Sequence, residues 1–365
     1  MKQMKLQEFY KNKRVLITGH TGFKGAWMCM VLKSLGANVY GYAMEPPTSP
    51  SLYELCGLRD EVKSSTADIR DLNRLRMDFN SFRPEIVIHM AAQPIVRESY
   101  RDPVYTYEVN VMGTVHLMEC VRNCPSVRSV VNVTTEKVYL NREWERGYTE
   151  EDELNGFDPY SNSKSCSELV TSCYKNSFLG GNTGKTEEGR EVRISTCRAG
   201  NVIGGGDFAA DRIIPDCLRA IETGKELVVR NPSSIRPYQH VLEPVVVYLE
   251  LAMEQWDNAA LAGSYNIGPK DQDCWTTAEL VTTYYEEWEK LTGQHIHWEE
   301  RHDGGPHEAN LLKLDCRKLC ENLCWKPVWN VRTALRKIAE WNCDYLAGEN
   351  MRAVTQRQID EYLSL

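Results

Sequence analysis

Two short segments of the sequence carry polar side chains that can act together on a substrate hydroxyl. The first is Thr134-Thr135-Glu136-Lys137, which follows an apolar run, and the second opens at Tyr160 and includes Lys164. Because side chains four residues apart share one face of a helix, Tyr160 and Lys164 are predicted to be neighbours. A free tyrosine has a pKa of about 10, so a nearby Lys164 and a hydrogen bond from Thr135 are needed to make the phenol a base. Taken alone, the same spacing is more often that of a solvent-exposed helix face.

A glycine-rich turn predicts a dinucleotide site. An apolar strand over 13–18 leads into Gly19-His20-Thr21-Gly22-Phe23-Lys24-Gly25, and a helical pattern covers 26–35. Glycines at a strand-to-helix turn let backbone N–H groups approach a pyrophosphate. The spacing Gly-x-x-Gly-x-x-Gly resembles that of short-chain dehydrogenases and differs from the more common Gly-x-Gly-x-x-Gly. The predicted contacts come from Gly19, Thr21, Gly22, Phe23, Lys24 and Gly25.

The end of the second predicted strand, over 38–43, bears on the choice between NAD and NADP. No Asp or Glu ends this strand to hold the adenosine 2′-hydroxyl, and the next acid is Glu45. No arginine follows to receive the 2′-phosphate of NADP. The sequence therefore favours NAD.

Two further segments are predicted to complete the cofactor site. Their residues are Asp68, Ile69, Ala91, Ala92 and Gln93. Similar enzymes hold the adenine from the position of Asp68, but the alternative, that Asp68 caps the helix beginning near Leu72, is equally compatible with the sequence. The other segment follows a continuous apolar strand over 86–89, where small residues let a nicotinamide ribose approach the backbone. Tyr160 and Lys164 are expected to contact the cofactor as well.

Strand and helix patterns alternate up to about residue 199. Helical stretches over 104–121 and 160–177 flank a strand over 129–133. This alternation predicts an α/β fold, a Rossmann-type doubly wound parallel sheet with its ligand crevice outside the carboxyl ends of the strands. With 365 residues the chain has room for a second domain. We expect an NAD-binding domain over 1–198 with 236–258, and a smaller, mixed α/β substrate-binding domain over 199–235 with 259–365.

The second half of the chain carries arginines beside turn residues. Arg212, Arg230 and Arg236 are predicted to fork onto the two phosphates of a nucleotide-linked substrate, and surface arginine is the alternative for each. Asn201, in a glycine-rich crossing over 198–207, and His307, in a later polar cluster, are the other predicted substrate residues.

Composition excludes several classes of function. A net charge of −8 argues against nonspecific nucleic-acid binding, and no apolar run reaches the length of a membrane span. Thirteen scattered cysteines indicate reduced thiols in a cytoplasm. Cys316, Cys320 and Cys324 are expected to be buried apolar side chains, and His295 and His297 to lie on one face of a partly exposed strand. We predict no metal site.

The chain resembles the extended short-chain dehydrogenase/reductase family, and within it is similar to the CDP-D-glucose 4,6-dehydratases. The resemblance runs from about residue 12 to 341. It rests on the glycine-rich turn, on the segments 46–52, 134–139, 141–144, 158–161 and 198–207, and on 236–244 and 307–316. Relatives commonly pair the helices over 104–121 and 160–177 with those of a second copy, which implies a homodimer or a dimer of dimers.

The resemblance implies a lyase that uses NAD and regenerates it. Tyr160, assisted by Lys164 and Thr135, would take the C4 hydroxyl proton of a nucleotide hexose while the C4 hydride leaves. Lys137 would remove the C5 proton, and Glu136 would protonate the departing C6 hydroxyl. Hydride return to C6 then gives a 4-keto-6-deoxyhexose for deoxysugar and surface-polysaccharide (O-antigen) biosynthesis.

One residue departs from the pattern of these relatives. They usually carry Asp where this chain has Glu136, and the extra methylene moves the carboxyl group by about 1 Å, a displacement that can cost roughly a hundredfold in rate. Two alternatives stay open: an epimerase or dehydrogenase that uses Tyr160 without elimination, and a noncatalytic NAD-binding sensor.

Overall fold

The central element of the fold is a parallel β-sheet of seven strands. The computed structural model describes residues 2–180, 189–301 and 311–365, and the strand order is β11-β6-β5-β4-β1-β2-β3. All neighbouring strands are parallel, and the order reverses between β1 and β4. This topology confirms the predicted α/β, doubly wound Rossmann-type sheet. The ligand crevice of such a sheet lies outside the carboxyl ends of the strands, at the reversal.

The strands form where short apolar runs rich in branched side chains can be covered on both faces. Every residue of β4 and β5 is buried. The predicted strands over 38–43, 86–89 and 129–133 match the observed bounds of β2, β4 and β5. The sheet contains β1 (Arg14–Thr18), β2 (Asn38–Ala43), β3 (Lys63–Thr66), β4 (Ile86–His89), β5 (Ser129–Val133), β6 (Arg193–Ala199) and β11 (Ser264–Ile267).

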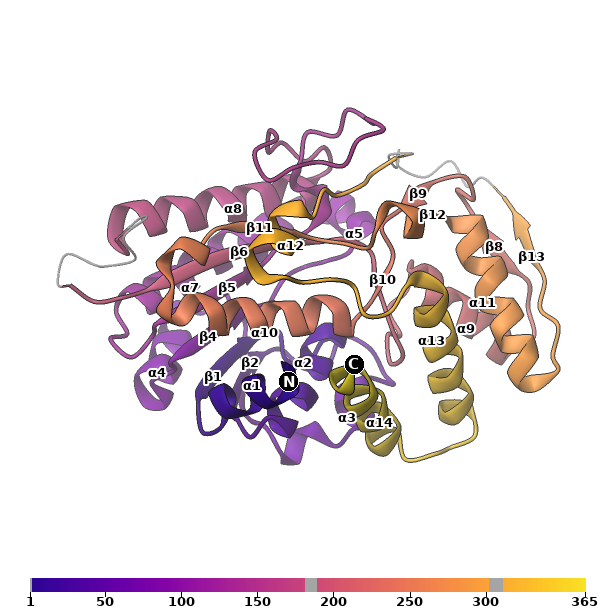
Figure 1. The fold of residues 1–365 in the computed structure, drawn as a ribbon, viewed down its shortest axis with the longest axis horizontal. Helices are drawn as coiled ribbons and strands as arrows, with labels where there is room; N and C mark the ends of the chain where they lie inside the picture. The colour runs from indigo at the N-terminus through magenta and orange to yellow at the C-terminus, as the bar shows by residue number, and fades with distance from the viewer. Residues whose placement is uncertain (1, 181–188, 302–310) are drawn as a thin grey trace.

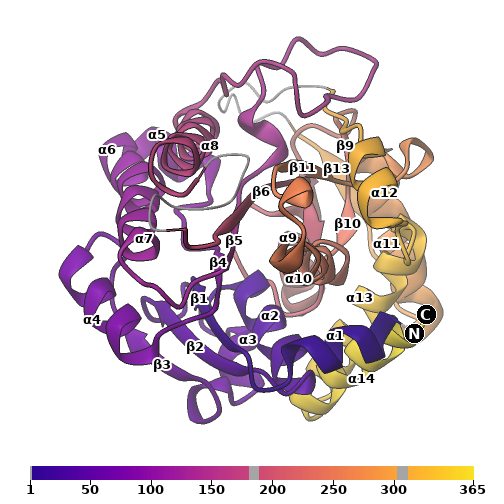
Figure 2. The same cartoon turned by 60° about the vertical axis from the view of Figure 1, so that its left-hand side comes forward.

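Helices cover both faces of the sheet (Figure 2). Helices α2 and α10 contribute to the largest hydrophobic core on one face, and α4 and α7 contribute to the core on the other. The bounds are α1 (Lys2–Tyr10), α2 (Phe23–Ser34), α3 (Leu52–Leu55), α4 (Leu72–Phe82), α5 (Val96–Arg101), α6 (Pro103–Tyr107), α7 (Gly113–Arg122), α8 (Pro159–Phe178) and α10 (Leu242–Asp257), with short helical turns η1 (Leu58–Asp60) and η3 (Glu136–Val138).

The helix predicted over 104–121 is interrupted. It consists of α6, a single π-helical turn η2 (Glu108–Met112) and α7. A π-helical turn inserts one extra residue into the helix, which rotates the residues after it by about 100° around the helix axis. The prediction of one uninterrupted helix did not include this shift.

A second group of elements forms its own core, on the right in Figure 1. It contains α9 (Ile213–Thr223), β8 (Leu227–Val229), α11 (Thr277–Thr292), β13 (Trp298–Glu300) and α13 (Val331–Leu346). Two small sheets, β7 (Val202–Ile203) with β10 (Gln239–His240) and β9 (Ile235–Arg236) with β12 (Trp275–Thr276), lie along the chain crossings. The remaining elements are η5 (Ala259–Leu261), η6 (Asp271–Asp273), α12 (Arg317–Leu323) and α14 (Met351–Ser364).

Two elements cross the predicted boundary between the two domains. Strand β11 falls within 259–365, yet it pairs with β6 at the edge of the large sheet. Helix α14 returns to the part of the chain around α3 and η1, where the Cys56 thiol lies 3.7 Å from the Thr355 hydroxyl and Arg352 pairs with Glu61. The first and last helices, α1 and α14, consequently lie side by side (Figures 1 and 2).

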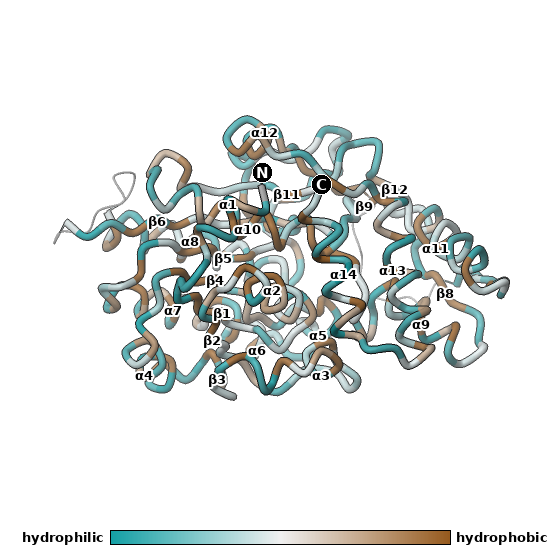
Figure 3. Tube along the Cα trace, turned by 60° about the horizontal axis from the view of Figure 1, so that its bottom comes forward, coloured by the Kyte–Doolittle hydropathy of each residue, from teal (hydrophilic) through white to brown (hydrophobic). Residues whose placement is uncertain are grey.

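Apolar residues are concentrated in the central layer of the fold, and polar residues on its outside. The central strands are largely brown in Figure 3, and many of the outer loops and helix faces are teal. Within the described ranges, no helix combines the length and the apolar content that a membrane crossing needs.

Candidate active site

Close backbone packing explains two glycines of the turn between β1 and α2. Gly19 has φ +76°, and an added Cβ there would lie 2.7 Å from the Ala91 nitrogen. An added Cβ at Gly25 would lie 2.2 Å from the Gly19 carbonyl oxygen. No side chain fits at either position, so the turn, the end of β4 and the first turn of α2 stay in direct contact.

Gly22 has a different environment, and it fits a pyrophosphate. Gly22 precedes the first residue of α2, no side chain caps this helix end, and an added Cβ would meet only the Gly19 oxygen at 3.5 Å. The Thr21 hydroxyl donates to the Met44 carbonyl at 2.9 Å, which fixes the turn against the chain after β2. An uncapped helix N-terminus beside an open glycine is the arrangement that binds phosphate groups.

The chain after β2 differs from its prediction. An arginine does lie there, because Arg59 of η1 places its Nη2 atom 2.6 Å from Oε2 of Glu45. The sequence could not reveal this arginine, since it arrives from a separate turn 14 residues away. Both side chains are more than half exposed, and Glu45 balances the charge of Arg59.

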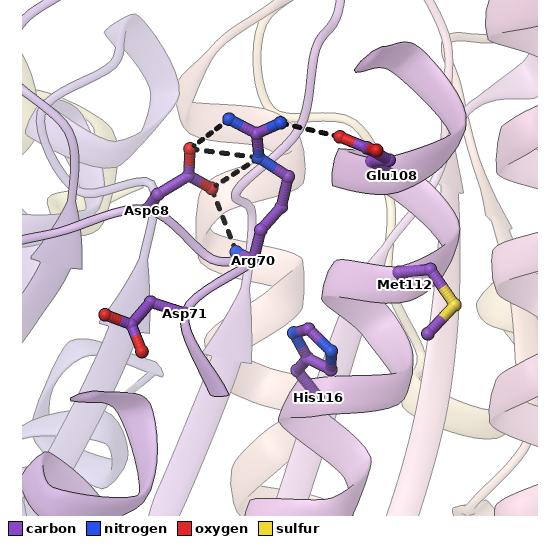
Figure 4. A pocket seen from close by; sticks show the side chains of 6 residues that line it. All are labelled: Asp68, Arg70, Asp71, Glu108, Met112 and His116. Carbon is purple, nitrogen blue, oxygen red and sulfur yellow. Dashed lines mark hydrogen bonds and ion pairs between the residues drawn. The ribbon is translucent and has the colours of Figure 1, made fainter. Parts of the chain in front are cut away.

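Asp68 borders a second, shallower hollow (Figure 4). Its carboxylate accepts from the Arg70 guanidinium at 2.9 Å, and the same guanidinium reaches Glu108 at 2.6 Å. The cap of α4 is Asp71, which accepts from the Arg74 backbone at 3.0 Å, so the alternative that Asp68 caps this helix is wrong. The assignment of Asp68 and Ile69 to the adenine stays a prediction.

The segment after β4 is held by buried hydrogen bonds. The Gln93 side chain donates to the Thr106 hydroxyl at 2.9 Å, and its backbone N–H donates to Asn110 at the same distance. The Ala91 N–H donates to the Thr18 hydroxyl at 3.2 Å. These bonds fix the backbone of Ala91, Ala92 and Gln93 beside the glycine-rich turn, where they were predicted to meet the nicotinamide ribose.

The predicted catalytic residues come together at the carboxyl end of β5. Thr135, Glu136, Lys137 and Tyr160 line one cavity of about 750 Å³. Thr135 caps η3, and Asp158 and Pro159 set the start of α8, since the Asp158 carboxylate accepts from the backbone of Ser161. Lys164 lies one helical turn further and donates to the Val133 carbonyl at 3.0 Å.

The electrostatics of Tyr160 differ from the prediction. Burial raises the pKa of Tyr160 above its ordinary value, the charge of Glu136 raises it further, and the hydrogen bond with Thr135 lowers it only in part. Lys164 does not lower the pKa of Tyr160 as predicted, because burial and the charge of Lys24 lower the pKa of Lys164 itself to about 7. In the protein alone, Tyr160 is therefore a neutral phenol.

Glu136 is the buried acid of the group. It is 4% exposed, and the Thr135 hydroxyl donates to its Oε2 atom at 2.6 Å. Lys24 of α2 lines the same cavity. Burial and the charge of Arg212 lower the pKa of Lys24 to about 8, while Glu136 acts in the opposite direction.

Four of the predicted substrate residues line this same cavity. Asn201, Arg212, Arg230 and Arg236 all line it. Asp207 holds Arg212 at 2.9 Å, and Asp211 holds Arg230 at 3.1 Å. The three arginines thus share one cavity, and their binding to substrate phosphates stays a prediction. His307 lies outside the described residues.

The sequence reasoning missed Arg97 and the two acids that hold the arginines. Arg97 of α5 lines the cavity from the sheet side, and its Nε atom is 4.0 Å from Oδ1 of Asp211. Asp211 has φ +60°, a left-handed conformation that is uncommon for aspartate. The sequence carried no signal for Arg97, because α5 begins only at Val96 and its contact with Asp211 joins two distant segments.

Two predictions about cysteine and histidine are wrong. Cys320 and Cys324 are exposed thiols, because α12 spans only seven residues and ends before Cys324. His295 and His297 precede β13 and do not share a strand face, although their rings meet edge to face at 4.5 Å. Across the ranges that the structure covers, no three His, Cys, Asp or Glu side chains are grouped to hold a metal ion.

Comparisons with known proteins agree with this geometry. Residues 16–338 match the family model described as GDP-mannose 4,6 dehydratase. A CDP-glucose 4,6-dehydratase of Salmonella typhimurium is 46% identical over 359 residues, which cover 98% of each chain.

Solved structures share the fold at lower identity. A dTDP-glucose 4,6-dehydratase of Bacillus anthracis, in complex with NAD, superposes with a TM-score of 0.73 at 20% identity, covering 92% of this chain and 98% of that one. A UDP-glucose 4-epimerase of Thermotoga maritima, with UDP-glucose, gives 0.75 at 21% identity over 91% and 99% of the two chains. At these identities the superpositions establish the fold alone.

Proposed function

Because this chain belongs to the GDP-mannose 4,6-dehydratase family, we propose that it is a hydro-lyase that converts CDP-D-glucose to CDP-4-keto-6-deoxy-D-glucose and water with bound NAD. The identity of 46% over nearly the full length of a CDP-glucose 4,6-dehydratase supports this substrate. The glycine-rich turn supports the cofactor, since Gly22 leaves an uncapped helix end open to a pyrophosphate.

The first step is oxidation at C4. The chemistry that NAD supplies when bound is acceptance of the C4 hydride and its later return to C6. Tyr160 takes the proton of the C4 hydroxyl, which leaves a C4 ketone. Because Tyr160 is a neutral phenol in the protein alone, a cationic neighbour is needed to make it a base. The charge of Arg212 already lowers the pKa of Tyr160, and a protonated Lys164, one turn along α8, would add to this effect.

The second step is elimination of water. The C4 ketone acidifies the C5 proton, which Lys137 removes. Glu136 gives a proton to the C6 hydroxyl, the C6–O bond breaks, and a C5–C6 double bond forms. Return of the hydride to C6 and of a proton to C5 completes a reaction whose net change is the loss of one water.

One observation carries this proposal. Glu136, Lys137 and Tyr160 line the same cavity as Arg212, Arg230 and Arg236. A proton acid, two candidate bases and three guanidinium groups thus face a volume of about 750 Å³, which suits a nucleotide sugar held by its diphosphate.

Mass spectrometry of reactions in heavy water tests the function. Purified protein with NAD is incubated with CDP-, dTDP-, GDP- and UDP-hexoses. We expect CDP-glucose to lose one water and the product to carry solvent deuterium at C5. Inversion at C4 with neither water loss nor deuterium would favour the epimerase, and absence of turnover with every hexose would favour the noncatalytic sensor.

The proposal includes a homodimer built on α6, η2, α7 and α8, with a dimer of dimers as the larger possibility. These elements pack against one another, and their outer sides expose apolar residues, namely Val104 (68%), Met112 (46%) and Leu169 (57%). A reducing cytoplasm and a role in deoxysugar and O-antigen biosynthesis also belong to the proposal. All thirteen cysteines are free thiols, which supports the reducing compartment.

A further inference from the structure

A buried ion pair lies directly beneath the residues assigned to elimination. Glu168 and Arg198 are each 3% exposed, and the guanidinium binds the carboxylate through two bonds, Nη2–Oε2 at 3.0 Å and Nε–Oε1 at 3.1 Å. Neither residue lines the cavity. A buried ion pair is weak evidence of added stability, because desolvation offsets much of the attraction. The role of the pair is better judged from the other residues to which it is hydrogen-bonded.

The pair reaches both ends of the segment that carries the acid and the base. At the first end, the Thr134 hydroxyl donates to Oε1 of Glu168 at 2.5 Å. At the other end, Nη1 of Arg198 donates to the Tyr139 hydroxyl at 2.9 Å. Glu136 and Lys137 lie between these two points.

The segment over 134–139 needs such support. Strand β5 ends at Val133, and only the three-residue 3₁₀ turn η3 follows, a type of helix with poor hydrogen-bond geometry. The Tyr139 hydroxyl in turn donates to Asn266 of β11 at 2.6 Å, so the second end is fixed to the sheet edge.

Two of the three redox residues, Tyr160 and Lys164, depend on the pair much less, whereas Thr135 lies inside the segment as the cap of η3. Tyr160, Lys164 and Glu168 recur every four residues along α8, a helix of 20 residues with its own aspartate cap. Residues with this spacing keep their relative positions through the backbone hydrogen bonds of the helix.

We propose that the Glu168–Arg198 ion pair is a positioning element for elimination, which clamps Thr134 and Tyr139 and thereby sets Glu136 and Lys137 against the hexose. The inference rests on the proposed dehydration. Displacement of an acid or a base by about 1 Å can cost roughly a hundredfold in rate. Loosening the clamp should therefore slow elimination more than the preceding oxidation, because both elimination residues lie in the segment, whereas the base of the oxidation, Tyr160, lies on α8.

Three nearly isosteric substitutions test the clamp. Thr134→Val removes the bond at one end and Tyr139→Phe removes the bond at the other. Thr196→Val is the matched control, because the Thr196 hydroxyl also donates to Glu168, at 2.6 Å, but from β6 and outside the segment.

For Thr134→Val and Tyr139→Phe we expect kcat for water loss to fall about tenfold to a hundredfold, KM to stay within about twofold, and a 4-keto hexose that retains its C6 hydroxyl to accumulate. Thr196→Val should not shift this product ratio. An equal shift in Thr196→Val, or an unchanged ratio in the other two variants, would overturn the inference.

Hydrogen–deuterium exchange provides a readout independent of turnover. Amides over 134–139 should exchange faster in Thr134→Val and Tyr139→Phe than in the wild type or in Thr196→Val. If wild-type protein removes no water from CDP-glucose, the proposed function fails, and the exchange rates still decide the clamp. Equal exchange in all four proteins would refute it.

Discussion

Lys164 is a buried residue whose side chain carries a charge when protonated, and burial disfavours that charge. It is 4% exposed, yet it carries an amine whose single close acceptor among the described residues is the Val133 carbonyl. Burial, aided by Lys24, lowers its pKa from the ordinary 10.5 to about 7. An ammonium that gives up its proton this readily destabilises the folded protein, and such a cost is common at functional sites.

Replacement of Lys164 by Met should stabilise the fold and abolish turnover. Between pH 7 and 10.5 the unfolded chain binds the proton that the folded chain releases, so the stability of the wild type rises with pH across this window. The gain from Lys164→Met should be about 0.5–2 kcal/mol near neutral pH and shrink as the pH rises through the window. Thermal melts of both proteins across this pH range measure it, and a gain that grows with pH would contradict the assignment.

Tyr160 allows a direct test of the first step. Tyr160→Phe removes the base and leaves the ring, so kcat should fall about a hundredfold to ten-thousandfold with little change in KM. Tyr174→Phe on the same helix is the control, because its hydroxyl contacts Glu119 away from the cavity. Product formation from CDP-glucose gives both rates. A comparable loss in the two variants would argue against a specific role for Tyr160.

At the scale of elements, two glycines between β1 and the first turn of α2 are expected to have different roles. Gly25 is needed for packing, and Gly22 is needed for binding the dinucleotide. Gly25→Ala places a methyl group 2.2 Å from the Gly19 oxygen and should destabilise the fold by roughly 1–3 kcal/mol. Gly22→Ala meets only one atom, at 3.5 Å, and should keep the melting temperature while it weakens binding of the dinucleotide. Thermal melts and NAD titrations of both variants measure the two effects. Weakened folding in Gly22→Ala would show that this glycine serves packing.

The same scale shows what the sequence can and cannot predict. Strands β2, β4 and β5 were placed with their observed bounds because each is an apolar run ended by a polar or small residue. The candidate catalytic residues over 135–137 were predicted because they directly follow such a strand. The sequence did not predict the contacts that join separate elements. These are Arg59 beside Glu45, Arg97 beside Asp211, and the clamp beneath Glu136. None of them leaves a periodic or local signal, since each depends on how two chain segments meet in space.

The pKa of Tyr160 illustrates the same limit for chemistry. The spacing to Lys164 correctly predicted a shared helix face, but it said nothing of how deeply that face is buried. Burial is a property of the assembled layers, and it raises the pKa of Tyr160 and lowers that of Lys164 together. A sequence motif therefore identifies the partners more reliably than their protonation states.

At the scale of the whole molecule, the exposed apolar face of α6, η2 and α8 can be tested through association. Leu169→Glu introduces a charge at a position that is 57% exposed and should convert dimers to monomers. Met77→Glu on α4 is the control, since Met77 is 66% exposed but lies outside that face. Light scattering after size-exclusion chromatography gives the mass of each species. Unchanged mass in Leu169→Glu would locate any dimer interface elsewhere.

The return of α14 to the first third of the chain has a consequence for how the protein folds during synthesis. The Cys56–Thr355 contact joins residues 299 positions apart, and Met351, Val354 and Ile359 belong to the same hydrophobic core as α1 and α2. While the ribosome is still translating the second half, this part of the core has no partner and faces water. A domain whose core includes a segment that is synthesised later exposes apolar surface until that segment emerges from the ribosome. Until then it depends on chaperones. Truncation before α14 should therefore destabilise the half of the chain that contains α1 and α2, although no residue of α14 lines the candidate active-site cavity.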